Sequence, residues 1–140
     1  MKIKIKRLDS SAKLPTYANP GDAGMDIYSN TDLFLMPHHR TLVPTGIAIA
    51  VPKKYVALVW DKSGLATKGI KTMAGVIDSG YRGEIKIALL NVSSKPYEIK
   101  KGEKVAQILI QPIVCGIIEE VKDLDKTERG KKGFGSSGLK

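Results

Sequence analysis

One carboxylate and one aromatic side chain, Asp78 and Tyr81, stand three residues apart at a bend of the segment AGVIDSGYRGE, residues 74–84. The residues before the bend are apolar and those after Glu84 alternate, which predicts a β-hairpin. Such a bend presents unpaired backbone N–H and C=O groups, which can bind the edge of a nucleic-acid base as a partner base would. A turn in which Asp78 caps the backbone is the structural alternative.

Glycines and cations gather again near the C-terminus, in RGKKGFGSSG, residues 129–138. Glycines let backbone N–H groups converge on a phosphate, and lysine or arginine adds positive charge. The segment is not a nucleotide-binding P-loop, because Ser136 and Ser137 follow Gly135 where that loop requires Lys and then Ser or Thr. Taken alone it is predicted to be a disordered tail, which a bound anion and a base stacked on Phe134 could order.

The charge of the chain points to anionic partners. Its 140 residues include 23 Lys and Arg against 14 Asp and Glu, which gives a formal charge of +9. Nucleic acid, a small phosphorylated ligand and a basic surface that serves solubility are all compatible with this charge. The lysines are spread along the whole sequence, and one Trp, five Tyr and two Phe form no obvious base-stacking array.

Short β-strands must position these residues, because the sequence has hardly any helical periodicity. Alternating or continuous apolar runs predict strands at residues 3–6, 47–51, 55–60, 85–89 and 105–114. Turns rich in Pro and Gly separate the runs at roughly ten-residue spacing, which indicates a β-sandwich or barrel. One helical turn is predicted over residues 64–68, with Asp61 or Ser63 as its N-cap.

The length suits one domain, which we expect to span residues 1–125, followed by a flexible arm at 126–140 that is rich in Gly, Ser and Lys. Cys115 stands among Ile and Val residues and is predicted to be a small buried core residue. His38 and His39 lack a matching carboxylate–histidine cluster and are predicted to be loop residues. No apolar run approaches the ~18 residues of a membrane span, so we expect a cytoplasmic protein without membrane contact.

Five segments together resemble, in order and at similar intervals, the five motifs of the trimeric dUTPase family. They are AGMDI (23–27), DKSGLA (61–66), GVIDSGYRGE (75–84), GEKVAQILI (102–110) and RGKKGFGSSG (129–138). The resemblance covers roughly residues 2–138. It implies an all-β, distorted jelly-roll or β-clip-like barrel with a flexible C-terminal arm. It also implies a homotrimer in which each active site takes its hairpin from one subunit, its second and fourth motifs from a neighbour and its tail from the third.

The resemblance also implies a reaction, the hydrolysis of dUTP to dUMP and pyrophosphate. This reaction limits uracil in DNA and supplies dUMP for dTMP synthesis. Asp78 would be the general base for the water that attacks the α-phosphorus, and Gln107 would hold that water or an α-phosphate oxygen. Tyr81 would pack beneath the deoxyribose and exclude a 2′-hydroxyl. The uracil would be bound by the hairpin backbone at Gly75, Val76 and Ile77 and would stack on Phe134.

The phosphate groups would be bound by residues of the second and last motifs. By the resemblance these are Lys62, Ser63, Gly64, Arg129, Gly135, Ser136 and Ser137. The implied ion is Mg²⁺, which bridges the phosphates and keeps most of its waters, so a dedicated protein cage is not required. Asp26 would hold the metal's water shell or brace the site.

Two positions separate this chain from related patterns. The second motif of the family usually carries Pro-Arg-Ser, and here Lys62 keeps the positive charge but loses the planar fork of arginine. The dCTP deaminases share the fold but use a catalytic glutamate where this chain has Ala88, which disfavours deamination. Two alternatives remain open: a non-catalytic regulator of the same fold that binds dUTP or a protein, and a nucleic-acid-binding β-barrel, although no stable nucleic-acid binding is expected.

Overall fold

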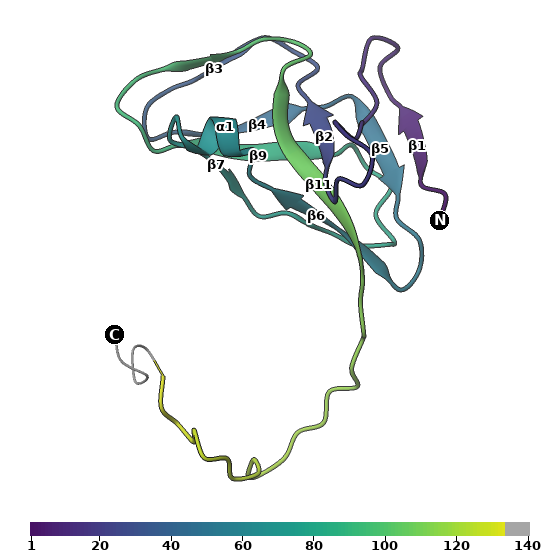
Figure 1. The fold of residues 1–140 in the computed structure, drawn as a ribbon, viewed down its shortest axis with the longest axis vertical. Helices are drawn as coiled ribbons and strands as arrows, with labels where there is room; N and C mark the ends of the chain where they lie inside the picture. The colour runs from purple at the N-terminus through teal and green to yellow at the C-terminus, as the bar shows by residue number, and fades with distance from the viewer. Residues whose placement is uncertain (134–140) are drawn as a thin grey trace.

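The computed structural model describes residues 1–133, which form eleven β-strands and one short helix (Figure 1). The strands are β1 (Lys4–Arg7), β2 (Met25–Tyr28), β3 (Leu33–Leu35), β4 (Arg40–Pro44), β5 (Ile47–Ala50), β6 (Tyr55–Trp60), β7 (Ile70–Met73), β8 (Val76–Ile77), β9 (Lys86–Asn91), β10 (Tyr97–Ile99) and β11 (Lys104–Pro112). The helix, α1, spans Ser63–Ala66. The expected all-β, jelly-roll-like class is confirmed.

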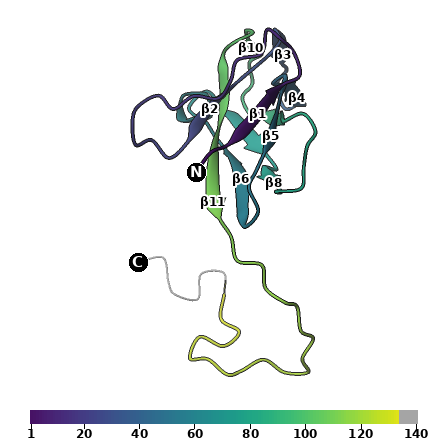
Figure 2. The same ribbon diagram turned by 90° about the vertical axis from the view of Figure 1, so that its right-hand side faces the viewer.

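Four antiparallel sheets make up the body. Their strand orders are β1-β5, β10-β3, β2-β11-β6-β8 and β4-β9-β7. The nine-residue strand β11 runs through the centre of the largest sheet, with β2 on one side and β6 on the other (Figure 1). In Figure 2, β3 and β10 lie at the end of the molecule opposite the point where the chain leaves β11. The central position of β11 lets it link the elements that carry several of the motifs.

The core follows the two-residue period of the strands. In β9, Ile87, Leu89 and Asn91 are buried while the residues between them are at least partly exposed. Such alternation is typical of a strand with one face against the core. Leu35, Val43, Ile49, Ala57, Ile99 and Ile108, from six different strands, join the same buried cluster. One apolar core therefore holds all four sheets together.

The five predicted strands correspond to β1, β5, β6, β9 and β11, and β6 matches residue for residue. The prediction for β11 was wrong at its end, because Pro112 is the last paired residue. Proline has no N–H to donate to the ladder, so the strand ends there instead of continuing to Val114. Cys115 follows this end and is exposed, so its predicted place in the core was also wrong.

The predicted hairpin at residues 74–84 was wrong in its pairing. β8 pairs with β6, whereas β9 pairs with β4 and β7, so the strands on either side of the bend lie in different sheets. The buried side chain of Ile85 and the hydrogen bond from its N–H to the carbonyl of Ile47 on β5 draw the chain away from β6 before β9 begins. The bend itself is retained, closed by a 3.1 Å hydrogen bond from the N–H of Tyr81 to the carbonyl of Asp78.

The helical turn begins one residue earlier than predicted, and neither predicted residue caps it. Lys62 is the N-cap residue and makes no side-chain capping bond. The carboxylate of Asp61 instead accepts hydrogen bonds from Thr72 on β7. Ser63 already belongs to the helix. The tertiary bond to Thr72 thus replaces the local cap that the sequence suggested.

Residues 113–133 leave the end of β11 as an extended segment without regular elements (Figure 1). Several apolar residues of this segment are almost fully exposed: Val114, Ile117, Ile118 and Leu124. The regular body therefore ends at Pro112, and the boundary at 125 stays a prediction. No helix in residues 1–133 has the length and apolar character to cross a membrane.

Candidate functional site

The first cavity lies beside β2, β6 and β11 and has a volume of about 590 Å³. Residues of three motifs line it: Ala23, Gly24, Asp26, Asp61, Lys62 and Gln107. Asp22, Trp60 and Leu109 complete much of its wall. Asp26 and Gln107 are direct cross-strand partners, and Gln107 is in turn opposite Trp60 on β6. The pairing of β11 with both neighbours is therefore what brings the first, second and fourth motifs together.

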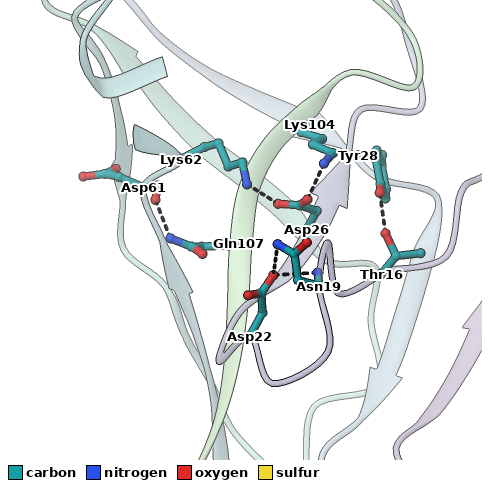
Figure 3. Close-up of polar contacts among 9 residues, drawn as sticks. All are labelled: Thr16, Asn19, Asp22, Asp26, Tyr28, Asp61, Lys62, Lys104 and Gln107. Carbon is teal, nitrogen blue, oxygen red and sulfur yellow. Dashed lines mark hydrogen bonds and ion pairs between the residues drawn. The ribbon is translucent and has the colours of Figure 1, made fainter. Parts of the chain in front are cut away.

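Asp26 is a buried carboxylate that lies between two lysines (Figure 3). The Nζ atom of Lys62 lies 2.5 Å from Oδ1, and the Nζ atom of Lys104 lies 2.6 Å from Oδ2. Burial raises the pKa of the Asp26 carboxyl, but hydrogen bonds and charge from Lys104 and Lys62 outweigh burial and hold the pKa below its ordinary value. These contacts keep Asp26 ionised and fix the end of the Lys62 side chain.

A β-bulge in β11 brings Lys104 to this face. Residues three apart in a regular strand point to opposite sides, so Lys104 and Gln107 should diverge. The register of β11 on β2 shifts between Lys104 and Ala106, which inserts one extra residue and reverses the alternation. Val105 and Ala106 are accordingly both buried, although they are neighbours in sequence. Lys104 and Gln107 therefore both lie on the Asp26 side of the sheet.

Gln107 is held by a backbone group of the second motif. Its Nε2 atom donates a 2.9 Å hydrogen bond to the carbonyl of Asp61 (Figure 3). Gly24 leaves space for the other end of the amide, since a Cβ atom added at Gly24 would lie 2.5 Å from Oε1 of Gln107. The amide is thus oriented from both sides, with Nε2 on Asp61 and Oε1 beside Gly24.

The second cavity, of about 490 Å³, contains the predicted base and sugar site. It is lined by residues of the third motif: Gly75, Val76, Ile77, Asp78, Tyr81 and Glu84. Val59, Met73 and Ala88 add apolar surface. Asp78 and Tyr81 are both exposed at its rim. The structure thus brings together every described residue that was predicted to contact base or sugar.

The backbone of the third motif is held close to β6. The N–H of Val59 donates a 2.9 Å hydrogen bond to the carbonyl of Gly75. Gly75 has φ +137°, and a Cβ atom there would lie 2.8 Å from the carbonyl oxygen of Val59. Glycine is required at this position because both the conformation and the close approach exclude a side chain. The start of the motif is therefore fixed by its contact with β6.

Tyr81 folds back over its own loop. Its hydroxyl donates a 2.9 Å hydrogen bond to the carbonyl of Glu84, and its ring lies against Gly83. Arg82 closes the other side of the loop, because its guanidinium donates to the carbonyls of Ser79 and Tyr81, both at 2.7 Å. The position of the ring is thus set by short contacts within residues 79–84.

The two cavities lie on opposite faces of β6. Val59 lines the second cavity and Trp60, the next residue, lines the first. Successive side chains of a strand point to opposite faces. A single chain therefore places Asp78 and Tyr81 in a different cavity from Lys62 and Gln107.

The remaining predicted residues lie apart from the two cavities or outside the described residues. Ser63 and Gly64 are exposed in α1, next to Lys62. Arg129 is exposed in the extended segment, where its Nε atom donates to the carbonyl of Lys132. Four predicted residues lie outside the described part of the chain: Phe134, Gly135, Ser136 and Ser137.

Sequence reasoning missed Lys104, Gly24 and Thr72. Lys104 and Gly24 stand inside quoted motifs, but their roles depend on the bulge and on the approach of Gln107. Thr72 stands in no motif and contacts Asp61 only through the fold. A bulge leaves no reliable trace in a single sequence, because alternation and its interruption look alike over four residues.

The described residues do not form a site that could bind a metal ion directly. Within residues 1–133, no three His, Cys, Asp or Glu side chains are grouped so that they could hold a metal ion. Both oxygens of Asp26 face ammonium groups, which compensate the charge that a cation would need. These contacts are those of a brace for Lys62. A divalent ion that works here fits best as part of a phosphate complex that enters with its own ligands.

We expect Thr72→Val to lower stability in a pH-dependent way. Oδ1 of Asp61 accepts 2.6 Å hydrogen bonds from the N–H and from the hydroxyl of Thr72. Burial raises the pKa of Asp61, but these bonds and Lys71 outweigh it and lower the pKa below 3.8. The stabilisation is present above pH 3.8 and lost as the pH falls through the lowered pKa. Loss of the hydroxyl should cost about 1 kcal/mol near neutral pH.

Urea unfolding at pH 7 and near pH 3, at fixed protein concentration, measures this effect. Thr67→Val is the matched control, because its hydroxyl donates to a neutral carbonyl, that of Gly64. The difference between Thr72→Val and the parent should shrink at the lower pH, whereas that of Thr67→Val should not. An equal loss at both pH values for Thr72→Val would contradict the role given to the Asp61 charge.

The chain is similar to known proteins over most of its length. The dUTPase family model matches residues 10–138. A deoxyuridine 5'-triphosphate nucleotidohydrolase of Clostridium tetani is 48% identical over 139 residues, which cover 97% of this chain and 96% of the relative. The dUTPase of Staphylococcus bacteriophage 80alpha, solved with dUPNHPP, superposes with a TM-score of 0.91 at 30% identity, covering 99% of both chains.

A second phage structure adds information about a metal. A mutant dUTPase from phage phi11 of S. aureus, described with a structural Mg(II) ion, has a TM-score of 0.82 at 25% identity. The superposition covers 88% of this chain and 98% of the phage chain.

Proposed function

This chain belongs to the dUTPase family, and we propose that it hydrolyses dUTP to dUMP and pyrophosphate by attack of water on the α-phosphorus of Mg²⁺-bound dUTP. The second cavity carries this proposal. It combines the backbone of residues 75–77, one exposed carboxylate and one exposed aromatic ring. A backbone edge can pair with uracil, a ring can support a sugar, and a carboxylate can accept a proton from water.

Asp78 is the general base in this proposal. Its carboxylate stands at the rim of the cavity, after the backbone of Gly75, Val76 and Ile77 that binds the uracil. Tyr81 supports the deoxyribose and leaves no room for a 2′-hydroxyl. Attack on a phosphate ester is assisted when an acceptor lies within hydrogen-bond reach of the water. Asp78 therefore takes the proton while the bond from the α-phosphorus to the bridging oxygen of pyrophosphate breaks.

The phosphate side of the reaction belongs to the first cavity. Lys62 supplies positive charge there, with Ser63 and Gly64 beside it at the start of α1. Gln107 holds the attacking water or an α-phosphate oxygen, because its amide is fixed by Asp61 and Gly24. Asp26 acts as the brace of Lys62.

The proposal includes a homotrimer with shared sites, and the separation of the two cavities supports the sharing. Asp78 and Gln107 line cavities on opposite faces of β6, which favours a site in which the two residues come from different subunits. In this assembly the third motif of one chain faces the second and fourth motifs of a neighbour. The third chain contributes its C-terminal arm, residues 126–140, in which Arg129 binds the γ-phosphate.

Four further residues of the arm, Phe134, Gly135, Ser136 and Ser137, complete the proposed site. Phe134 stacks on the uracil, and the other three donate N–H and O–H groups to the phosphates. Mg²⁺ enters with the triphosphate, neutralises part of its charge and favours attack at the α-phosphorus when bound.

The substrate preference gives the decisive experiment. Purified protein with Mg²⁺ should release pyrophosphate from dUTP far faster than from dTTP, dCTP or UTP, because the cavity admits neither the 5-methyl of thymine nor a 2′-hydroxyl. Pyrophosphate release with each nucleotide measures this preference. Similar rates on all four nucleotides would contradict the specificity, and no release from dUTP would contradict the proposed function.

Gly83→Ala is expected to weaken the discrimination between dUTP and UTP. A Cβ atom at Gly83 would meet the hydroxyl oxygen of Tyr81 and lie 2.6 Å from Cζ, so the rigid ring must move. The ring supports the deoxyribose, and the ratio of kcat/KM values for dUTP and UTP should fall about tenfold. Gly80→Ala is the matched control in the same loop, since an added Cβ meets nothing within 4 Å. Equal ratios in the two variants would refute this role of Gly83.

A further inference from the structure

Positive charge is scarce in the first cavity. Lys62 is the only cation among its lining residues, whereas three carboxylates line it, those of Asp22, Asp26 and Asp61. Asp22 accepts hydrogen bonds from Asn19, a neutral residue that does not compensate the carboxylate. A cavity with this lining would repel a phosphate chain unless at least one of these carboxylates is compensated from outside.

Lys71 partly compensates Asp61, whose Oδ2 lies 3.7 Å from its Nζ, and Lys104 compensates Asp26. Lys104 reaches Asp26 from another side than Lys62 does, and each of these two lysines contacts a different carboxylate oxygen (Figure 3). Oδ2 of Asp26 has no other hydrogen-bond partner in residues 1–133, so Lys104 is its only compensation there. Two ammonium groups and one carboxylate leave a net charge of +1 on the cluster.

Without Lys104, the same carboxylate would face Lys62 alone. The side chain of Asp26 is 3% exposed and that of Lys104 is 44% exposed, so water could enter where Lys104 is lost, but it would carry no positive charge to compensate the carboxylate. The pair of Asp26 and Lys62 would then be neutral, and Lys62 would be held to the carboxylate more tightly. Lys62 could not attract a phosphate chain without giving up its contact with a buried and otherwise uncompensated charge.

We propose that Lys104 is a positioning residue of the phosphate site: by pairing with Oδ2 of Asp26, it leaves the charge of Lys62 available to the triphosphate. The inference rests on the proposed function, because it assigns the triphosphate to the first cavity. The bulge at Val105 is the structural device that makes it possible, since a regular strand would turn Lys104 to the other face.

The test compares Lys104→Gln with Lys104→Arg, which keeps the charge. Calorimetry with Mg²⁺ and a non-hydrolysable imido analogue of dUTP measures the affinity for the triphosphate. Inhibition by deoxyuridine, which has no phosphate, measures the affinity for base and sugar. We expect Lys104→Gln to lower the affinity for the analogue about tenfold and to leave the affinity for deoxyuridine unchanged. Lys104→Arg should stay close to the parent in both measurements.

A second substitution separates this role from a merely structural one. In Asp26→Asn/Lys104→Gln the competing carboxylate is gone, so the ammonium group of Lys62 is available to the triphosphate. The double variant should bind the analogue more tightly than Lys104→Gln does. A structural defect caused by the loss of Lys104 would not be repaired by removing a second buried group.

Three results would overturn the inference. The first is an unchanged affinity of Lys104→Gln for the analogue, and the second is an equal loss of affinity for the analogue and for deoxyuridine. The third is a double variant that binds the analogue no more tightly than Lys104→Gln does. These results are distinct from a failure of the proposed function. That failure would show as absent dUTP turnover in the parent protein, which is measured first.

Discussion

Asp78→Asn should leave the protein folded and able to bind dUTP but should lower kcat by about 10²–10⁴-fold. The asparagine has nearly the same shape as the aspartate, and Asp78 is exposed at the rim of the second cavity, so neither the fold nor the cavity should change. The amide cannot accept a proton from water as a carboxylate can. Steady-state pyrophosphate release gives kcat, and calorimetric titration with dUTP gives the affinity.

Asp22→Asn is the control for the loss of a carboxylate at a cavity. Asp22 lines the first cavity, where its side chain accepts hydrogen bonds from Asn19 rather than facing the proposed base site. This variant should keep kcat within a few-fold of the parent. An Asp78→Asn protein that retained more than about a tenth of the parent kcat would show that another group is the base.

Gly24→Ala should produce a stable protein with about 10²-fold lower kcat, because a displacement of about 1 Å in a positioned group can cost that much. The added methyl would lie 2.5 Å from Oε1 and 3.3 Å from Cβ of Gln107, so the side chain must swing away. Gly24 does not have a positive φ, and the alanine therefore adds no backbone strain. The flexible side chain can yield, so the loss should appear in catalysis and not in stability.

Gly116→Ala provides the comparison, since a Cβ atom there meets nothing within 4 Å. Kinetics and thermal unfolding of both variants should show an unchanged Tm in each and a loss of kcat only in Gly24→Ala. If Gly24→Ala kept the parent kcat, the fixed orientation of the Gln107 amide would not matter for turnover.

The class of fold could be predicted because a strand with one buried face has a two-residue period that sequence displays directly. Ile85, Ile87 and Leu89 alternate with less buried residues, and β6 was predicted without error. The strands β2, β3, β4, β7 and β10 were not predicted. β8 has two residues and β3 and β10 have three, which is too short for any period to show, and only their partners make them strands.

Short segments of the sequence also determined which residue types the site has. Asp78, Tyr81 and the glycines beside them lie within one short segment, so their proximity needs no long-range folding. Gln107 and Lys62 could be named as site residues for the same reason, since each stands in a recognisable motif. What the sequence settled by itself is thus the class of fold and the chemistry that local segments carry.

Only the tertiary structure decided which of these residues face one another. The pairing of β11 with β2 and β6 set Gln107 beside Asp26, and the alternation of β6 put the two cavities on opposite faces. The bulge turned Lys104 toward Asp26, a contact between residues 78 positions apart. Such contacts depend on strand register. Register is fixed by the packing of the whole core, which no local segment contains.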